Sequence, residues 1–255
     1  MGTALVTGAS SGIGRAFAEA LAARRDDVVL VARDTARLDQ LASKLKGAHG
    51  THAEVLGADL TADAGVAAVE ERLRAGVDLL VNNAGFGTFG KFAELPIETE
   101  LGEVQLNVVA LVRLCRAALP GMIERGAGGI VNVSSVAGHQ PTPYNATYGA
   151  TKAFVTSFTH SLHEEARSTG VRVTVLCPGF TKTEFQERAG FDSSAVPGFL
   201  WQSAEEVAAA ALQANDKNRA ECVPGLLNRI SATVSGALPA AVSRRLAGAV
   251  VRRVE

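Results

Sequence analysis

The chain has 255 residues, of which 47% are hydrophobic and 20% charged, and these proportions exclude a disordered chain. Its 25 basic and 26 acidic residues give a net charge of −1, so the total charge does not predict nucleic-acid binding. The charge is uneven, because residues 225–255 hold five arginines and one acid, a net +4, which leaves −5 for the rest. We expect a single domain over residues 1–255, with residues 225–255 as a basic C-terminal extension of it.

The three cysteines lie far apart and form no CxxC pair, which argues against a disulfide scaffold and favours a reducing compartment. The five histidines are scattered and predict no metal site. The start MGTALVTGAS lacks the pattern of a secretion signal, and the longest stretch without a charged residue, 126–151, contains Asn and Pro. We therefore expect a cytoplasmic protein without a membrane span.

Short β-branched runs alternate with longer amphipathic stretches and predict strands at residues 3–7, 28–32, 53–58, 78–81, 130–133 and 171–176. The runs are almost continuously apolar, as in a parallel sheet covered on both faces. We predict an α/β fold with a doubly wound parallel sheet of about seven strands and helices on both faces. The alternation stops after about residue 225.

A glycine-rich turn, TGASSGIG at residues 7–14, joins the first expected strand to the first expected helix. Glycines allow a tight turn and the close approach of a pyrophosphate, and the helix N-terminus attracts anions. The spacing is GxxxGxG rather than GxGxxG, and a turn without any nucleotide is the alternative. The pattern predicts a dinucleotide site at Gly8, Ser10, Ser11, Gly12, Ile13 and Gly14.

The second expected strand ends at Arg33 and Asp34, where an acid favours NAD and an arginine favours a 2′-phosphate. Arg33 therefore favours NADP(H), with NAD as the disfavoured alternative. Asp34 would repel that phosphate if its side chain pointed inward. The remaining interpretation is that both residues are solvated charges on a loop.

Tyr148 precedes Lys152 by four residues, which places both side chains on one face of a helix. An adjacent ammonium favours the charged form of a tyrosine, so we expect Lys152 to lower the pKa of Tyr148. Ser135 follows the strand expected at 130–133, at the carboxyl ends of the strands, where ligands bind. A surface Tyr–Lys pair and a serine that only caps a turn are the alternatives.

These residues, in this order and spacing, resemble the compact single-domain branch of the short-chain dehydrogenase/reductase family. The resemblance covers residues 3 to about 223 and implies a Rossmann-type sheet. It rests on TGASSGIG at 7–14, NNAG at 82–85, Asn107, Ser135, YGATK at 148–152 and Pro178-Gly179 with Thr183.

By this resemblance, Tyr148 is the general acid in reduction and the base in oxidation, and Ser135 hydrogen-bonds the substrate oxygen. Lys152 holds the nicotinamide ribose, and Asn107 positions a water in a proton relay to Lys152. The resemblance also implies cofactor contacts by Asp59, Leu60, Asn83, Ala84, Gly85, Pro178, Gly179, Thr181 and Thr183. The loop serines replace a basic residue common in NADP-preferring members, so Arg33 carries the NADP prediction. A catalytically silent NADP(H)-binding sensor is the alternative function.

Eight of the 13 aromatic residues fall in two segments that this fold places beside the active site. We expect a small-molecule substrate, an apolar and fairly bulky carbonyl or alcohol, with a lid or subunit contact as the alternative. The aromatic residues are Phe86, Phe89, Phe92, Phe180, Phe185, Phe191, Phe199 and Trp201.

Two further segments carry expectations about motion and partners. Ser193, Ser194, Pro197 and Gly198 predict a mobile lid. From Pro239 the tail reads as a basic amphipathic helix. Such a helix has three possible roles. It packs against another subunit in a homo-oligomer (a dimer or tetramer), covers the substrate crevice, or makes a peripheral membrane contact.

Overall fold

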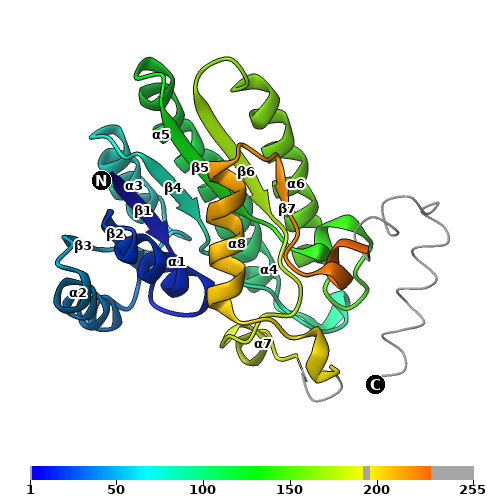
Figure 1. Cartoon of the computed structure of the whole chain (residues 1–255). Helices are drawn as coiled ribbons and strands as arrows, with labels where there is room; N and C mark the ends of the chain where they lie inside the picture. The colour runs from blue at the N-terminus through cyan, green and yellow to red at the C-terminus, as the bar shows by residue number, and fades with distance from the viewer. Residues whose placement is uncertain (1, 192–195, 231–255) are drawn as a thin grey trace.

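The computed structural model describes residues 2–191 and 196–230 (Figure 1). The expected lid serines, Ser193 and Ser194, and the expected helix from Pro239 lie outside the described residues. Seven parallel strands form one sheet in the order β3-β2-β1-β4-β5-β6-β7. The strands are β1 (Thr3–Thr7), β2 (Asp27–Ala32), β3 (Ala53–Gly57), β4 (Leu79–Asn82), β5 (Gly128–Val133), β6 (Val171–Leu176) and β7 (Glu221–Cys222).

Helices cover both faces of this sheet. Successive strand residues point to opposite sides, and because those on both sides are apolar, both faces have to be buried. In β1, Ala4 and Val6 pack into one core layer and Leu5 packs into the other. The first layer holds α1 (Gly12–Ala23), α2 (Thr35–His49) and α8 (Ala204–Asp216), and the second holds α3 (Asp63–Arg74), α5 (Leu111–Glu124) and α6 (Ala146–Glu165). Figure 1 shows α1 and α8 in front of the sheet. The predicted doubly wound fold is confirmed.

The connections after the strands carry the short elements. They are η1 (Phe92–Glu94), α4 (Ile97–Val104), the π-helical segment η2 (Gln105–Ala110), η3 (Val136–His139), α7 (Phe185–Arg188) and η4 (Gly198–Leu200). The helical stretch Ile97–Glu124 is long and apolar enough to cross a membrane by length and composition alone. Leu111, Leu114, Cys115, Ala118 and Met122 of this stretch nevertheless lie in the core against the sheet.

Strand boundaries agree with the prediction to within one residue except in β5, which begins two residues earlier, at Gly128. Glycine is a poor strand former, which hid this start. The structure requires it at Gly129, where an added Cβ would lie 2.6 Å from Oδ1 of Asn215. β7 has only two residues and produced no recognisable run.

A buried chain of polar side chains crosses the middle of the sheet. Asn82 and Asn132 are paired across β4 and β5, and Nδ2 of Asn82 donates to Oδ1 of Asn132 at 2.9 Å. Nδ2 of Asn132 then donates to Oγ1 of Thr159 on α6 at 3.0 Å. The chain links two strands and a helix inside an otherwise apolar layer.

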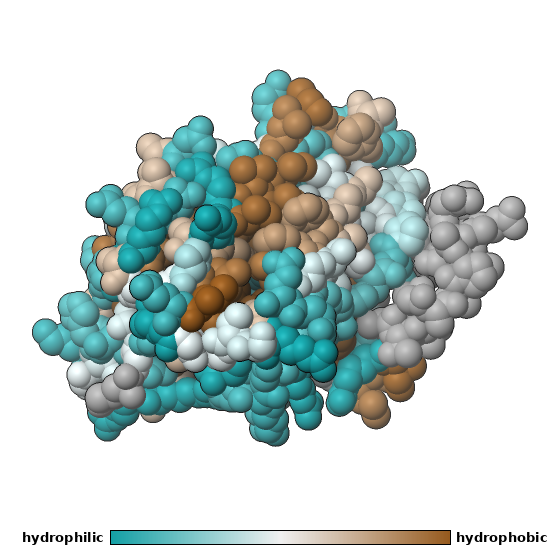
Figure 2. Space-filling view, turned by 90° about the horizontal axis from the view of Figure 1, so that it is seen from above, coloured by the Kyte–Doolittle hydropathy of each residue, from teal (hydrophilic) through white to brown (hydrophobic). Residues whose placement is uncertain are grey.

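Several large apolar side chains remain exposed on the α4–α6 side, namely Ile97, Leu101, Val104, Val109 and Phe154. Figure 2 shows one face of the molecule from above, with a patch of apolar residues flanked by hydrophilic ones.

Candidate active site

The glycine-rich turn lies between β1 and α1 and has the backbone that its glycines predict. Gly8 and Gly12 have φ values of +67° and +53°, a region that residues with a Cβ rarely adopt. At Gly14 an added Cβ would lie 2.3 Å from the carbonyl oxygen of Gly8, so only glycine fits there.

The N-terminus of α1 opens onto this turn without a side-chain cap. Ser11 at the N-cap makes no capping hydrogen bond, and the first turn holds no acidic residue. The free N–H groups and the partial positive charge of the helix fit an anionic group. The segment Gly8 to Gly14, including Ser10 and Ile13, thus has the form that a pyrophosphate needs.

The end of β4 holds this turn in place. Nδ2 of Asn83 donates to the carbonyl oxygen of Thr7 at 2.9 Å, and the backbone N–H groups of Asn83 and Ala84 both donate to Oγ1 of Thr7 at 2.9 Å. The predicted cofactor residues Asn83 and Ala84 are therefore adjacent to the glycine turn, and the Asn83 amide supports its backbone.

The side chain of Asp34 caps the N-terminus of α2. Its Oδ1 accepts from the backbone N–H of Arg37 at 3.0 Å, and its Oδ2 lies 3.4 Å from Nε of Arg37. Arg33 is exposed at the end of β2 and interacts electrostatically with Asp59. The arrangement leaves Arg33 near Asp59, a predicted cofactor residue, while Asp34 is engaged by the start of α2.

Asp59 and Leu60 follow β3, where Leu60 is buried. The Asp59 carboxylate accepts two hydrogen bonds from Thr61, one from its backbone N–H at 3.0 Å and one from its hydroxyl at 2.8 Å. These bonds hold the pKa of the Asp59 carboxyl below its usual value.

Ser135, Tyr148 and Lys152 come together at the carboxyl end of β5. Ser135 is buried, accepts from the backbone N–H of Ala137 at 3.1 Å, and shares a hydrogen bond with the Tyr148 hydroxyl. Nζ of Lys152 lies 5.5 Å from the centre of the Tyr148 ring and donates to the carbonyl oxygen of Val133 at 2.9 Å. Ser135 thus caps η3, as the alternative predicted, and also contacts Tyr148.

Asn107 lies in the π-helical segment η2, a type of irregularity that is frequent at functional sites. Its Nδ2 donates to the carbonyl oxygen of Phe86 at 2.9 Å and to Oγ1 of Thr151 at 3.1 Å. A Cβ on Gly85 would lie 2.9 Å from Oδ1 of Asn107 and 3.4 Å from Nζ of Lys152. Asn107, Lys152 and Gly85 therefore border the same small space.

The predicted lowering of the Tyr148 pKa by Lys152 is wrong for the protein chain by itself. Burial raises the pKa of Tyr148 to about 12, although the hydrogen bond with Ser135 opposes this rise. Burial likewise lowers the pKa of Lys152 to about 8, with the carboxylate of Glu103 opposing. The sequence spacing identified the pair, but burial dominates the pKa of both members.

Two buried glutamates beside this site were not predicted. Glu100 and Glu103 on α4 are buried, and Oγ1 of Thr88 donates to Oε1 of Glu100 at 2.6 Å. Oε1 of Glu103 is buried without a hydrogen-bond partner. Burial, reinforced by Glu100, raises the pKa of Glu103 to about 7, while Thr88 and Lys152 oppose the rise. Acids three residues apart on a helix are typical of an exposed charged face, so their spacing does not indicate this burial.

The loop after β6 carries the last predicted cofactor residues. The carbonyl oxygen of Pro178 accepts from the backbone N–H of Val136 at 3.1 Å, and Oγ1 of buried Thr181 donates to the carbonyl oxygen of Gly179 at 3.1 Å. This loop therefore lies against the turn that follows Ser135.

Thr183 faces the glycine turn, since a Cβ on Gly12 would lie 3.0 Å from Cγ2 of Thr183. On the other side of the loop, the amide of Asn228 lies where a Cβ on Gly179 would be. Residues 226–230, which are helical, thus begin the C-terminal extension in contact with the active-site loop.

The aromatic residues of the two predicted segments contact one another across the chain. Ring centres are 5.3 Å apart for Phe89 and Phe191, 6.0 Å for Phe180 and Phe191, and 5.6 Å for Phe180 and Trp201. The Phe185 ring lies 5.4 Å from the Tyr148 ring. Phe92 and Phe199 are exposed instead. An apolar wall therefore adjoins the Tyr148 ring.

Comparison with known proteins places this arrangement among related enzymes. Residues 2–193 match the family profile described as short chain dehydrogenase. An oxidoreductase of Myxococcus xanthus is 41% identical over 196 residues, which cover 74% of this chain and 76% of that protein.

Two solved structures share both fold and sequence with the chain. A short-chain dehydrogenase from Sphingobium yanoikuyae in complex with NADPH is 38% identical, with a TM-score of 0.85 over 94% of this chain and 96% of that one. A bulky-bulky ketone specific alcohol dehydrogenase from Comamonas testosteroni is 34% identical, with a TM-score of 0.80 over 94% and 95%.

Proposed function

Because the chain belongs to the short-chain dehydrogenase/reductase family, we propose that it transfers hydride between NADP(H) and the carbonyl or alcohol carbon of an apolar substrate. The observation that carries the proposal is the meeting of Ser135, Tyr148, Lys152 and Asn107 at the carboxyl end of β5. Binding of a dinucleotide alone requires no tyrosine acid. This set therefore favours an enzyme over a silent sensor.

The roles of the residues follow from their atoms and contacts. The hydroxyls of Ser135 and Tyr148 lie within hydrogen-bonding reach of each other, and each can turn its one proton to a substrate oxygen, on which negative charge develops during reduction. Tyr148 then supplies the proton, and Lys152 would return one to it from solvent through a water that Asn107 would hold in the space beside Gly85. Bound NADPH supplies the hydride.

NADP(H) rather than NAD(H) is supported by the two charged residues after β2. Arg33 is exposed and lies near Asp59, whereas Asp34 is held by the start of α2. Arginine pairs well with a phosphate, and the Sphingobium yanoikuyae relative was solved with NADPH.

A bulky apolar substrate is supported by the rings beside Tyr148. Phe185 contacts Tyr148 directly, and Phe180, Phe191 and Trp201 extend the apolar wall. The Comamonas testosteroni relative is described as specific for bulky-bulky ketones.

We further propose a homo-oligomer in the cytoplasm. The exposed apolar residues Ile97, Leu101 and Val104 on α4 and Phe154 on α6 support subunit contact. All three cysteines are free thiols, which suits a reducing compartment. Light scattering of the purified chain tests the oligomer, and a monomer at all concentrations would contradict it.

The decisive test follows NADPH consumption with a panel of bulky and small ketones and aldehydes. We expect Tyr148→Phe to lose turnover while it still binds NADPH, because only the hydroxyl is removed. Ser161→Ala on the exposed part of the same helix serves as the control and should keep full activity. Turnover of Tyr148→Phe near that of the control would contradict the proposal, and NADPH binding without turnover of any substrate would favour the sensor.

Cofactor preference has a separate test by fluorescence titration. Arg33→Ala should weaken NADPH binding by about 10-fold or more, since it removes a charge-assisted pair with a phosphate. NADH binding should change little. Tighter binding of NADH than NADPH by the unaltered chain would reverse the preference.

A further inference from the structure

Three side chains with metal-binding atoms meet at one edge of the sheet, although they are far apart in the sequence. His139 ends the turn η3 that follows β5, Cys177 comes directly after β6, and Glu221 begins β7. β5, β6 and β7 are neighbours in the sheet, so these positions converge. The backbone N–H of Cys177 donates to the carbonyl oxygen of Cys222 at 2.8 Å, which fixes the sulfur-bearing residue against β7.

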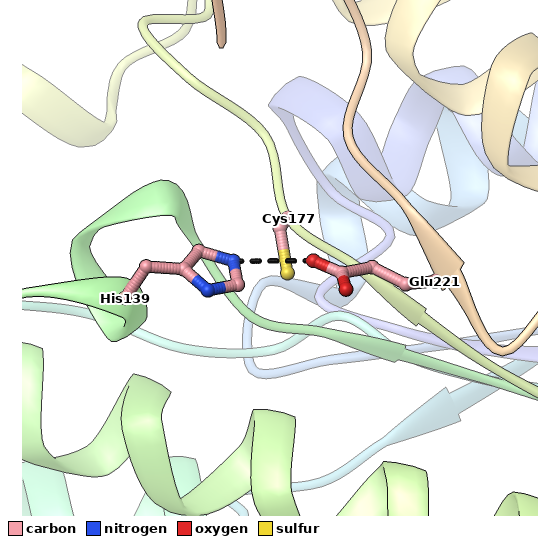
Figure 3. Close-up of side chains that lie close together, drawn as sticks. All are labelled: His139, Cys177 and Glu221. Carbon is pink, nitrogen blue, oxygen red and sulfur yellow. Dashed lines mark ion pairs between the residues drawn. The ribbon is translucent and has the colours of Figure 1, made fainter. Parts of the chain in front are cut away.

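Figure 3 shows that His139 and Glu221 point toward each other and that the sulfur of Cys177 lies beside the line between them. Nε2 of His139 is 3.2 Å from Oε1 of Glu221. The three ligand atoms all lie within 4.8 Å of one another. The other oxygen of Glu221 is 3.5 Å from Nε2 of His160, which orients the carboxylate.

Burial and hydrogen bonding leave this cluster incompletely paired. Nε2 of His139 is buried and makes no aligned hydrogen bond, despite its approach to Glu221. The sulfur of Cys177 is buried, with Oγ1 of Thr156 3.9 Å away. The side chain of Glu221 is 31% exposed, so the cluster is open to solvent on that side.

A nucleophilic role for Cys177 does not fit its surroundings. Burial raises the pKa of the Cys177 thiol, and the nearby Glu221 carboxylate adds to the rise. Reactive cysteines need the opposite, a lowered pKa and access to solvent. A buried thiol of this kind can still lose its proton when a metal cation binds the sulfur in its place.

We propose that His139, Cys177 and Glu221 bind one zinc ion. Imidazole, thiolate and carboxylate are the three ligand types that Zn²⁺ takes in proteins. A tetrahedral ion with bonds of about 2.0–2.3 Å has ligand atoms roughly 3.3–3.8 Å apart, so atoms that lie within 4.8 Å of one another have to move together by at most about 1.5 Å. Binding forms a Zn–S bond and releases the thiol proton to solvent, and a water completes the four ligands.

The site would join three segments next to the active site. His139 lies on the turn capped by Ser135, and Cys177 precedes the Pro178–Gly179 loop. Zinc would therefore hold this turn, this loop and the short edge strand β7 together. We expect it to raise the thermal midpoint of the full chain.

Cobalt titration of the full chain under reducing conditions tests the site, because a Co²⁺–thiolate bond gives a near-ultraviolet charge-transfer band. We expect one equivalent to bind, one proton to be released, and Zn²⁺ to remove the band. Cys177→Ser should abolish the band. Glu221→Gln should weaken binding by about 10- to 100-fold.

Cys222→Ser is the matched control, since Cys222 lies beside Glu221 on β7 and is a partly exposed free thiol. It should keep the band. The absence of a band in the unaltered chain, its survival in Cys177→Ser, or its loss only in Cys222→Ser would each overturn the proposal. Because Cys177 is buried, circular dichroism checks that Cys177→Ser folds, and the partly exposed Glu221 supplies an independent variant.

Discussion

The buried carboxyl of Glu103 makes the stability of the protein depend on pH. Its pKa is about 7 in the folded chain, against an ordinary value of 4.5. A carboxyl whose pKa is raised by folding holds its proton more tightly in the folded state, so its contribution to stability falls as pH rises from about 4.5 to about 7. Between pH 5 and pH 8 this group should cost the fold about 2–3 kcal/mol.

Glu103→Gln removes this titration and keeps the shape of the side chain. We expect the free energy of unfolding of the variant, relative to the unaltered chain, to improve by about 2–3 kcal/mol between pH 5 and pH 8. A buried, unpaired amide at position 103 adds a cost of about 1–3 kcal/mol. That cost is the same at both pH values, so the change with pH reports the carboxyl together with its coupling to Lys152.

Urea denaturation followed by circular dichroism at the two pH values measures the effect. Glu98→Gln is the control, because Glu98 is exposed on the same helix, and its difference from the unaltered chain should be nearly independent of pH. Equal differences for Glu103→Gln at pH 5 and pH 8 would refute the reasoning and mean that Glu103 is not desolvated as described.

Three further predictions concern the site. Gly14→Ala should destabilise the fold by at least about 1–3 kcal/mol in urea denaturation and abolish NADPH binding, because its Cβ would overlap Gly8. Gly47→Ala in α2, with no atom within 4 Å of the added Cβ, should instead stabilise by up to about 1 kcal/mol. The pKa of Lys152 is about 8, so kcat/KM should fall as pH rises through about 8. Glu103→Gln should move that fall in kcat/KM to lower pH. A pH–rate profile whose fall stays at the same pH would argue against coupling between Glu103 and Lys152. Phe185→Ala should lower kcat/KM for bulky ketones by about 10- to 100-fold and leave small ones little changed; equal losses for both would contradict an apolar wall.

The parts of the fold and site that depend on local sequence were predictable. The strand runs, the glycines at positions 8, 12 and 14, and the spacing of Tyr148 and Lys152 each reflect a short-range geometric requirement. Their positions in the structure follow from the strand order.

Properties that depend on surroundings were not predictable in the same way. The pKa of Tyr148 was expected to fall and rises instead, because burial is set by residues distant in the sequence. Glu103 is buried by contacts that its helical spacing does not encode. His139, Cys177 and Glu221 looked unrelated because only the order of β5, β6 and β7 brings them together.

The buried pair of Asn82 and Asn132 bears on how β4 and β5 find their alignment. Apolar strands of similar residues can slide past each other by two positions with little loss of packing, since the same face stays buried. Such a slide would break the hydrogen bond between the two amides, and a polar group that loses its partner in the core costs about 1–3 kcal/mol. The pair therefore penalises misaligned sheets during folding, and Leu at both positions should give a protein whose two strands pair less uniquely.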